Sequence, residues 1–477
     1  MQRGILSFSA YVPALRIDRA AIAAANAWAF PSARGKGARA LTSWDEDSIT
    51  MAVEAARGTD TADVGSILFA STTPPFADLQ NATIVATALA LPETVTTLDA
   101  TGSIRAGASA LLSALRGGTA GATLVVAADA RLAKPGSAQE MQYGAGAVAF
   151  TVGEGAPIAR LIGAASRADL FVDHFRATGE PFDYYWEERW VRDEGYAKLV
   201  PAAVKAALDE AGVTGADIAH FCLPSLTGGA GAAVARKLGI PAEAISDTLQ
   251  ARCGDTGAAH GLLMLAAALE KAKPGEKLLL VAFGAGCDVL LFEATDAIAD
   301  YTPRQRVAAA IEGGRVEPHY TKLLSFHGHL ALDWGMRAEA NDKIPLTQQY
   351  RARDQLAGFV AGECPDCHAV QFPQLASCVN CGSFSPLAPR PLVEEPAKVA
   401  TYTADWLQYH PSPPLYFGLV QFDNGARVLM EIVDVDPATL DVGTPLRMVY
   451  RIKSADRERH YTRYFWKAAP VSAAAGD

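Results

Sequence analysis

Short hydrophobic runs alternate with alanine-rich segments over the first 300 or so residues of the chain. Runs such as SILFA, ATLVVAADA and KLLLVAF have the length and composition of buried strands. The segments between them are rich in residues that favour helices. This alternation is typical of βαβ units, whose strands are largely parallel and covered by helices. The pattern therefore predicts an α/β fold for this region of the chain.

A weak internal repeat lies within this region. The first copy runs through LDATGSIRAGASALLSALRGG to ATLVVAADA, and the second runs through CGDTGAAHGLLMLAAALEKAKPG to KLLLVAFGAG. Each copy passes through a glycine-containing turn, an Ala/Leu-rich helix, a glycine stop and a strand. Chance similarity between alanine-rich helices is the alternative. The shared order of elements favours a duplicated half-domain, with halves at residues 1–165 and 166–300.

Two CxxC motifs follow a connecting segment at residues 301–345. Cys364 and Cys367 form the first motif, Cys378 and Cys381 form the second, and ten residues separate the two motifs. Four thiolates at this spacing suit one tetrahedral Zn²⁺ ion, and four protein ligands leave no open position for catalysis. Four unconnected cysteines are the alternative. The spacing predicts a structural zinc ribbon, preceded by a helix, within residues 346–390.

Short alternating strands fill the region from residue 391 to 470. The runs LYFGLVQF and ARVLMEIVDV flank Asn424 and Gly425, and an Asn-Gly pair between two such runs is a strong hairpin signal. Several short strands in about 75 residues predict a small barrel of the OB type. We expect residues 471–477 to form a disordered tail.

Composition and charge exclude several classes of function. The formal net charge is −10, and residues 346–469 hold 12 Lys and Arg against 13 Asp and Glu, so the chain lacks the basic footprint of a nucleic-acid-binding protein. No apolar run of 18 or more residues predicts a membrane span, and no signal peptide is expected. Clustered cysteines indicate metal binding in a reducing compartment. We therefore expect a cytoplasmic protein with neither a nucleic-acid nor a membrane partner.

Five segments carry a resemblance to a known family: GILSFSAYVPALRI, SWDEDSITMAVEAA, NATIVATALALP, AKPGEKLLLVAFGAG and CGDTGAAH. They resemble the 3-hydroxy-3-methylglutaryl-CoA synthase branch of the thiolase superfamily. The tail, from YRARDQ to YFWK, resembles the zinc-ribbon/OB-fold proteins that accompany many thiolases, usually as separate chains. The resemblance implies a five-layered αβαβα core with two pseudo-repeated halves, a homodimer of such cores, and coenzyme A as substrate or cosubstrate in a tunnel bordered by the accessory module.

The resemblance also implies catalytic positions, and the chain departs from the family at all of them. The family's carboxylate base, nucleophilic cysteine, histidine and asparagine align with Thr72, Ile104, Cys222 and Asp255. Isoleucine cannot attack a thioester, so we expect no acyl-enzyme at residue 104. Ser103 is interpreted as a packing or helix-capping residue.

Polar and reactive side chains nevertheless occur in turns where open α/β sheets place ligands. Asp255 suits proton transfer, because an ionised carboxylate repels a developing oxyanion; the alternative is a helix cap. His260 is either an acid/base or oxyanion donor, or a hydrogen-bonded core histidine. Cys287 is the best candidate nucleophile, ahead of Cys222, although such cysteines more often serve packing.

Aromatic and ionic side chains concentrate between Asp173 and Tyr196, with His174, Trp186 and Trp190 among them. They line a pocket for an aromatic acyl group, or they form a paired surface or dimer-contact segment. Both interpretations stay open on sequence alone.

The last strands carry seven basic residues against only Asp456 and Glu458. Four of the basic residues are candidates for binding the phosphates of coenzyme A: Arg447, Arg451, Lys453 and Arg459. Arginine can bind phosphate oxygens through two parallel hydrogen bonds. A solvated strand face is the alternative.

These features predict a CoA-dependent carbon–carbon lyase or acyltransferase that acts on a 3-oxoacyl substrate by retro-Claisen cleavage or its reverse, without the usual nucleophilic cysteine. CoA thiolate would attack the 3-keto carbon directly, while Asp255 or His260 moves protons. A retro-aldolase acting on a 3-hydroxyacyl-CoA is the second hypothesis. A non-catalytic scaffold that binds CoA for a partner thiolase is the third.

Overall fold

The computed structural model describes residues 3–118, 121–339 and 342–471, which form two compact units. The larger unit comprises Met1–Ser43, Asp47–Thr83 and Pro92–His329, and the smaller comprises Trp44–Glu46, Ile84–Leu91 and Leu330–Asp477. The tail expected beyond residue 471 lies outside the described residues. The domain boundaries expected at residues 165 and 300 stay predictions.

A nine-stranded mixed sheet forms the framework of the larger unit, in the order β11-β12-β13-β8-β1-β7-β6-β4-β5. Its strands are β1 (Gly4–Tyr11), β4 (Val64–Ala70), β5 (Thr96–Ala100), β6 (Ala122–Ala130), β7 (Ala145–Gly153), β8 (Ala159–Ala168), β11 (Ile218–Cys222), β12 (Lys277–Phe283) and β13 (Gly286–Ala294).

Three neighbouring pairs in this sheet are parallel and the other five are antiparallel. The prediction of largely parallel strands is therefore wrong. A parallel neighbour needs a long crossover connection. The chain instead passes from β12 to β13 through a tight turn at Gly284 and Ala285, so β13 returns antiparallel to β12.

The two halves of this sheet repeat a single arrangement. The order β4-β6-β7-β1 in the first half recurs as β11-β12-β13-β8 in the second. In both halves a parallel pair is followed by two antiparallel pairs. This repetition confirms the duplicated half-domain that the sequence predicts.

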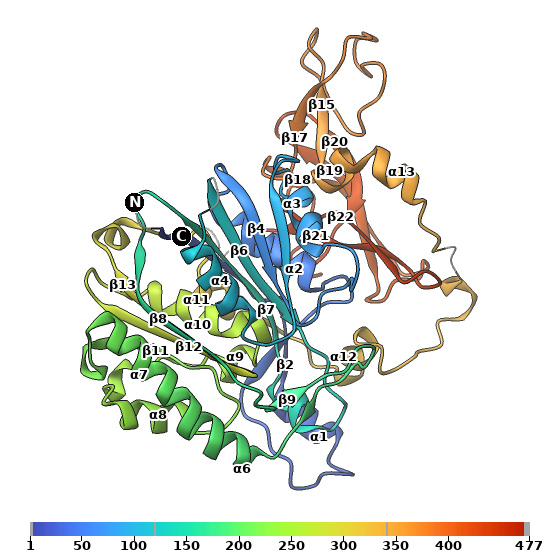
Figure 1. The fold of residues 1–477 in the computed structure, drawn as a ribbon. Coiled ribbons are helices and arrows are strands. Elements are labelled where there is room, and N and C mark those ends of the chain that lie inside the picture. The colour runs from blue at the N-terminus through green and yellow to red at the C-terminus, as the bar shows by residue number, and fades with distance from the viewer. Residues whose placement is uncertain (1–2, 119–120, 340–341, 472–477) are drawn as a thin grey trace. The chain divides into compact units, whose positions relative to one another are not determined.

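Helices form three layers around the two halves of the sheet (Figure 1). Between them lie α4 (Ala106–Arg116) and α10 (His260–Leu269), which contact each other and strands of both halves. On the outside, α2 (Ser48–Arg57) packs on β1, β6 and β7, and α7 (Val200–Ala211) packs on β8, β12 and β13. The arrangement is the expected five-layered αβαβα fold.

The two central helices are buried on nearly every side, as a helix between two sheets must be. Small residues permit their close approach. A Cβ atom on Gly107 of α4 would lie 2.3 Å from the carbonyl oxygen of Ala258, in the turn that leads into α10. The close approach brings the starts of both helices together, although they come from different halves.

Shorter elements complete the larger unit. A three-stranded sheet has the order β14-β2-β3, and β9 pairs with β10. These elements are β2 (Leu15–Asp18), β3 (Ala38–Leu41), β9 (His174–Phe175), β10 (Tyr184–Tyr185), β14 (Arg315–Val316), α1 (Arg19–Ala25), α5 (Ala138–Gln142), α6 (Glu188–Trp190), a π-helix (Val191–Leu199), α8 (Ala230–Leu238), α9 (Gln250–Cys253), α11 (Val307–Glu312) and α12 (Tyr320–Phe326). Helix α3 (Asn81–Ala88) is divided between the units. No helix in the described regions of the chain is long and apolar enough to cross a membrane.

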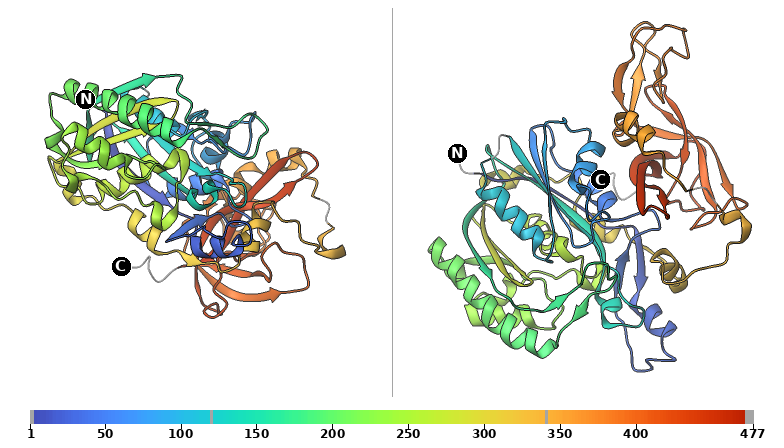
Figure 2. Two further views of the ribbon diagram at one scale, coloured as in Figure 1. Left: turned by 90° about the horizontal axis from the view of Figure 1, so that it is seen from below. Right: turned by 45° about the vertical axis from the view of Figure 1, so that its right-hand side comes forward.

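The smaller unit contains a three-stranded ribbon and a five-stranded barrel, with orders β16-β15-β17 and β20-β19-β18-β21-β22. Its elements are α13 (Leu346–Arg351), α14 (Arg353–Ala357), β15 (Val360–Glu363), β16 (Val370–Gln371), β17 (Ala388–Pro391), β18 (Ala397–Asp405), β19 (Leu415–Phe422), β20 (Arg427–Glu431), β21 (Pro445–Asp456) and β22 (Tyr461–Pro470). The long strands β21 and β22 run side by side (red in Figure 2). The hairpin predicted at Asn424 and Gly425 joins β19 to β20.

Candidate functional site

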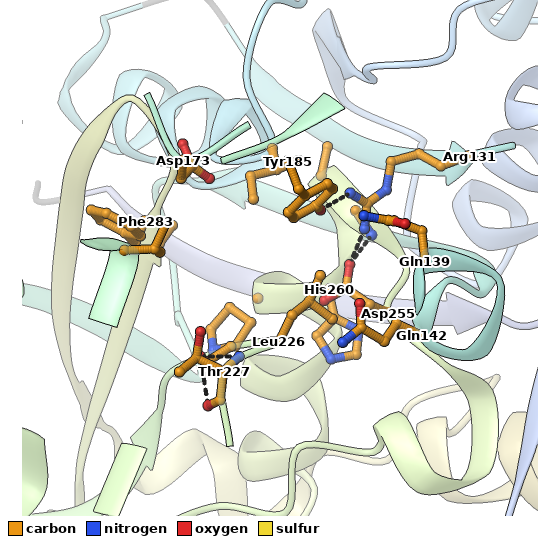
Figure 3. A pocket seen from close by; sticks show the side chains of 18 of the residues that line it. Arg131, Gln139, Gln142, Asp173, Tyr185, Leu226, Thr227, Asp255, His260 and Phe283 are labelled. Carbon is orange, nitrogen blue, oxygen red and sulfur yellow. Dashed lines mark hydrogen bonds and ion pairs between the residues drawn. The ribbon is translucent and has the colours of Figure 1, made fainter. Parts of the chain in front are cut away.

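A cavity of about 190 Å³ lies in the larger unit, where the starts of α4 and α10 meet (Figure 3). Ile104, Asp255 and His260 line it, as do Asp173 and Tyr196. The cavity thus collects residues that the sequence singles out from both halves. Thr72, Cys222 and Cys287 are not among its lining residues.

Asp255 is held by three protein donors in the wall of this cavity. Its Oδ1 accepts hydrogen bonds from Nη2 of Arg131 and, at 3.0 Å, from the N–H of Gly257. Its Oδ2 accepts one from Nε2 of Gln250 at 3.2 Å. Burial alone would raise the pKa of Asp255, but the charge of Arg131 and the hydrogen bonds from Gly257 and Gln250 hold it below its ordinary value. Both oxygens are engaged, which favours a positioning role over proton transfer.

Arg131 is a cavity residue that the sequence interpretation does not identify. Its guanidinium lies 3.9 Å from the centre of the Tyr143 ring, and Nη1 donates to the hydroxyl of Tyr185 at 3.4 Å. The carboxylate of Asp183 lies 3.7 Å away. Arg131 directly follows the buried strand β6, and a polar residue at the end of such a strand is a signal that could have identified it.

Tyr185 adds a hydroxyl group to the cavity. Burial raises its pKa above the ordinary value, so the group stays protonated. Its ring stacks on that of His174 with centroids 5.0 Å apart. The cavity therefore contains a fixed cation, a fixed carboxylate and a neutral hydroxyl donor.

Asp129, fully buried in β6, fixes two turns next to the cavity. Its carboxylate accepts hydrogen bonds from backbone and hydroxyl groups of Thr72 and Thr73, at 2.7–3.0 Å. It also accepts one from the N–H of Ala258 at 2.7 Å. Thr72, which the resemblance aligns with the family's base, therefore binds Asp129. The backbone N–H of Ala258 is likewise occupied by a carboxylate.

Ile104 lies where the resemblance predicts the family's nucleophile, in the turn that starts α4. Ser103 beside it donates its hydroxyl proton to the carbonyl of Gly284 at 2.9 Å. Arg105 donates to the same carbonyl at 3.0 Å. This arrangement agrees with the structural role expected for Ser103.

His260 is fully buried and both of its ring nitrogens have backbone partners. Nδ1 lies 3.1 Å from the N–H of Thr256, and Nε2 lies 2.9 Å from the carbonyl of Thr248. A backbone N–H can only donate and a carbonyl can only accept, so the ring is neutral with its proton on Nε2. Burial lowers the pKa of His260, in agreement with this state. Of the two interpretations, the structure favours the hydrogen-bonded core histidine.

Cys222 and Cys287 are fully buried. Burial raises the pKa of Cys222 to about 11 and that of Cys287 to about 12. Because the thiolate is the nucleophilic form, these pKa values disfavour attack by either thiol at neutral pH. The placement disfavours the nucleophilic role considered for them.

The segment between Asp173 and Tyr196 supplies an aromatic wall to the cavity. Trp186, Val191 and Tyr196 line it, and Val191 and Tyr196 belong to the π-helix. π-Helical turns occur frequently at functional sites. The wall supports the pocket interpretation of this segment. Trp190 is not among the lining residues.

In the smaller unit, the four ribbon cysteines form a group that could hold a metal ion. Their sulfur atoms lie within 4.8 Å of one another. Cys364 and Cys381 are 3.8 Å apart, and Cys367 and Cys378 are 3.6 Å apart. Tetrahedral Zn–S bonds of about 2.3 Å imply sulfur separations of about 3.8 Å. The donor set therefore fits one zinc ion with no open position.

Two basic residues on the long strands of the smaller unit are buried against acidic residues. Arg451 is 1% exposed and pairs with Glu46 at 3.2 Å and with Asp434 at 2.9 Å. Lys467 is equally buried and pairs with Asp45 at 2.9 Å. Burial removes Arg451 from contact with a phosphate of coenzyme A, because its donors face these carboxylates.

The other three candidates for phosphate binding are more accessible. The side chains of Lys453 and Arg459 are 42% and 50% exposed, and Arg447 is half-buried. Arg459 lies 3.5 Å from Asp456 and donates to the carbonyl of Ile344. A phosphate-binding role for these three residues stays a prediction.

Two protein-family models match parts of the chain. Residues 208–290 match the 3-oxoacyl-[acyl-carrier-protein] synthase III C-terminal domain, and residues 392–451 match the ChsH2 C-terminal OB-fold domain. The second match confirms the OB-fold expected from the strand pattern.

Curated relatives named hydroxymethylglutaryl-CoA synthase extend the similarity. The Aeropyrum pernix protein is 30% identical over 346 residues, which cover 69% of this chain and 95% of the relative. The Archaeoglobus fulgidus protein is 32% identical over 326 residues, which cover 65% of this chain and 94% of that relative.

Solved structures show the same fold at low sequence identity. MvaS in complex with 3-hydroxy-3-methylglutaryl coenzyme A superposes with a TM-score of 0.56 at 18% identity, covering 68% of this chain and 91% of MvaS. FabH from Pseudomonas aeruginosa superposes with a TM-score of 0.54 at 21% identity, covering 62% of this chain and 99% of FabH. These similarities identify the chain as an enzyme of the acyltransferase type. It belongs to the hydroxymethylglutaryl-CoA synthase family of thiolase-fold proteins and carries an OB-fold accessory domain.

Proposed function

We propose that the chain makes or breaks a carbon–carbon bond of a CoA thioester by Claisen-type chemistry, without an acyl-enzyme. One observation carries the proposal: the cavity contains Ile104 and Asp255, and no cysteine occurs among its described lining residues. The family supports the involvement of CoA, since one solved relative is a hydroxymethylglutaryl-CoA synthase complexed with CoA.

In the cleavage direction, the thiolate of free CoA attacks the 3-keto carbon of a 3-oxoacyl-CoA. The bond between C2 and C3 then breaks, and its electron pair becomes the enolate of acetyl-CoA. The proton released by the CoA thiol returns to C2, which yields acetyl-CoA and a shortened acyl-CoA. CoA would take over the attack that the resemblance assigns to a cysteine at the position of Ile104.

The cavity residues suit this reaction as positioning groups and hydrogen-bond donors. Arg131 holds Asp255 and Tyr185 in fixed places. The protonated hydroxyl of Tyr185 would donate to the developing enolate oxygen, because a preorganised donor stabilises charge as it forms. Asp255 would keep Arg131 in position. His260 would fix the turn before α10 and remain neutral.

The second candidate is a retro-aldol cleavage of a 3-hydroxyacyl-CoA. A base removes the proton of the 3-hydroxyl, the bond between C2 and C3 breaks, and the thioester enolate is protonated at C2. The products are acetyl-CoA and an aldehyde or ketone. The absence of a thiol among the described lining residues favours this candidate as well, because the reaction needs no nucleophile.

Product analysis tests both candidates. The chain is incubated with a 3-oxoacyl-CoA plus CoA, or with a 3-hydroxyacyl-CoA alone, and the products are separated by liquid chromatography and identified by mass. Two acyl-CoA products from the first mixture indicate the Claisen-type reaction. A carbonyl compound and acetyl-CoA from the second indicate the retro-aldol reaction. Formation of neither contradicts the proposal.

We also propose a structural zinc ion, a cytoplasmic location and a homodimer formed through the core of the larger unit. β5 is the last strand at one edge of its sheet, and Leu98 in it is 55% exposed. An exposed edge strand with an apolar residue favours pairing with a second copy. Light scattering that reports a monomer at micromolar concentration would contradict the dimer.

A further inference from the structure

The cavity has chemically different sides (Figure 3). Arg131, Gln139 and Gln142 lie on one side of the view, and Phe283 lies on the opposite side with Asp173 above it. The remaining apolar lining residues include Ile104, Trp186, Val191, Tyr196, Leu226 and Leu262. We call these apolar residues and Phe283 the apolar wall of the cavity. An apolar lining with a few polar groups is typical of a site that binds an apolar group and fixes its orientation.

The apolar wall is supported from behind. The ring of Phe283 lies 5.0 Å from that of Tyr196 and 5.6 Å from that of Phe171, which in turn stacks on Trp190 at 5.8 Å. Ile104 packs close by, since a Cβ atom on Gly284 would lie 2.7 Å from its Cγ1 atom. Aromatic rings locked in this way offer a fixed apolar surface.

Volume and charge restrict what this surface can accept. The cavity of about 190 Å³ exceeds the ~150 Å³ apolar cavity that binds benzene in an engineered protein. Asp173 and Glu188 also line it, and the charge of Arg131 is already opposed by Asp255 and Asp183. A negatively charged acyl group would therefore meet carboxylates without a free cation.

We propose that the substrate carries a bulky, uncharged apolar acyl group of the size of one ring, and that the aromatic wall selects it. The inference rests on the proposed function, in which the ligand is a CoA thioester. It names the substrate class of the same site. Short acyl groups leave the wall uncovered, and acyl groups that end in a carboxylate meet Asp173 and Glu188.

Equilibrium binding of four ligands tests the selection without any turnover: CoA, acetyl-CoA, glutaryl-CoA and phenylacetyl-CoA, each titrated by calorimetry into the full chain. We expect phenylacetyl-CoA to bind about tenfold more tightly than acetyl-CoA or glutaryl-CoA, because burial of one ring contributes at least that factor. Equal affinities for the three thioesters would overturn the inference and leave the proposed function intact.

Two tryptophans provide a matched pair of variants. Trp186 lines the cavity and is 54% exposed, whereas Trp28 is 88% exposed and is not among the lining residues. Trp186→Ala should remove most of the preference for phenylacetyl-CoA, while the affinity for CoA stays unchanged. Trp28→Ala should keep the preference. Loss of the preference in Trp28→Ala but not in Trp186→Ala would overturn the role of the wall.

Two further tests use a variant that fills the cavity and a small ligand that carries a ring without CoA. Together they distinguish failure of this inference from failure of the proposed function. Leu226→Trp should weaken phenylacetyl-CoA binding by about tenfold, and Leu170→Trp, at a position that is 97% exposed, should not. Titration of 2-phenylethanol alone measures how well the apolar wall binds a ring that carries no CoA. If 2-phenylethanol binds and no thioester does, the proposed function fails while the preference for an apolar ring stands. If neither binds, the inference is overturned.

Discussion

Arg131 and Asp255 form an ion pair inside the cavity although they lie 124 residues apart in the chain. Their side chains are 1% and 9% exposed. Arg131 follows β6 of the first half, and Asp255 precedes α10 of the second. The pair therefore joins the two halves of the duplicated fold at the site itself.

Asp255→Asn should destabilise the protein. The substitution nearly preserves shape but leaves the Arg131 guanidinium with the more distant Asp183 as its nearest counter-ion, and removing one partner of a buried pair costs about 3 kcal/mol. Urea unfolding at pH 7 measures the loss. The double variant Arg131→Gln/Asp255→Asn should lose less stability than the sum of the losses in the two single variants, because the two side chains interact. An Asp255→Asn variant as stable as the wild type would show that the carboxylate acts only as a helix cap.

Acid should weaken the smaller unit through Glu431. Burial raises the pKa of this carboxyl, but the hydrogen bond from His410 and the charge of Lys467 outweigh it and lower the pKa from 4.5 to about 2. Between these values the unfolded chain binds a proton that the folded chain does not, so stability is full above pH ~4.5 and is lost as the pH falls towards ~2.

Hydrogen–deuterium exchange of peptides from residues 415–470 measures this effect. We expect protection to fall between pH 4.5 and pH 2, and to fall less steeply in Glu431→Gln, which lacks the titrating group. If protection falls with pH equally steeply in the wild type and in Glu431→Gln, the assignment of the acid effect to Glu431 is contradicted.

Metal analysis should find about one zinc ion per chain. Cys364→Ser and Cys381→Ser should each lose the ion and loosen the ribbon, while the larger unit stays folded because the four ligands all belong to the smaller unit. The matched control is Cys253→Ser, which changes a buried cysteine outside the ribbon and should keep the zinc. A fully folded, metal-free ribbon would contradict this assignment.

Local sequence signals predict local structure well in this chain. The CxxC spacing gives a ligand set of four residues that lie close together, and Asn424-Gly425 gives the hairpin between β19 and β20. The repeated turn–helix–strand order predicts two halves because the same short segments recur in each. These signals need only neighbouring residues or the comparison of one segment with another.

Signals that depend on distant partners are harder to interpret from sequence. The basic strands resemble a phosphate-binding face until Asp45 and Glu46, some 400 residues earlier, are found to neutralise Arg451 and Lys467. Asp255 resembles a general base until Arg131 is found beside it. No spacing rule connects residues so far apart. The antiparallel order around β13 differs from the prediction because a tight turn replaces the expected crossover.

Intact-protein mass spectrometry during turnover tests the central claim most directly. The chain is mixed with a 3-oxoacyl-CoA and CoA, and the reaction is quenched in acid within the first turnovers. The mass of the intact protein is then measured. We predict that two acyl-CoA products accumulate while the protein mass stays unchanged, because Ile104 cannot accept an acyl group and the buried thiols of Cys222 and Cys287 stay protonated. A protein fraction heavier by the mass of the acyl group, which disappears when substrate is exhausted, would contradict the account.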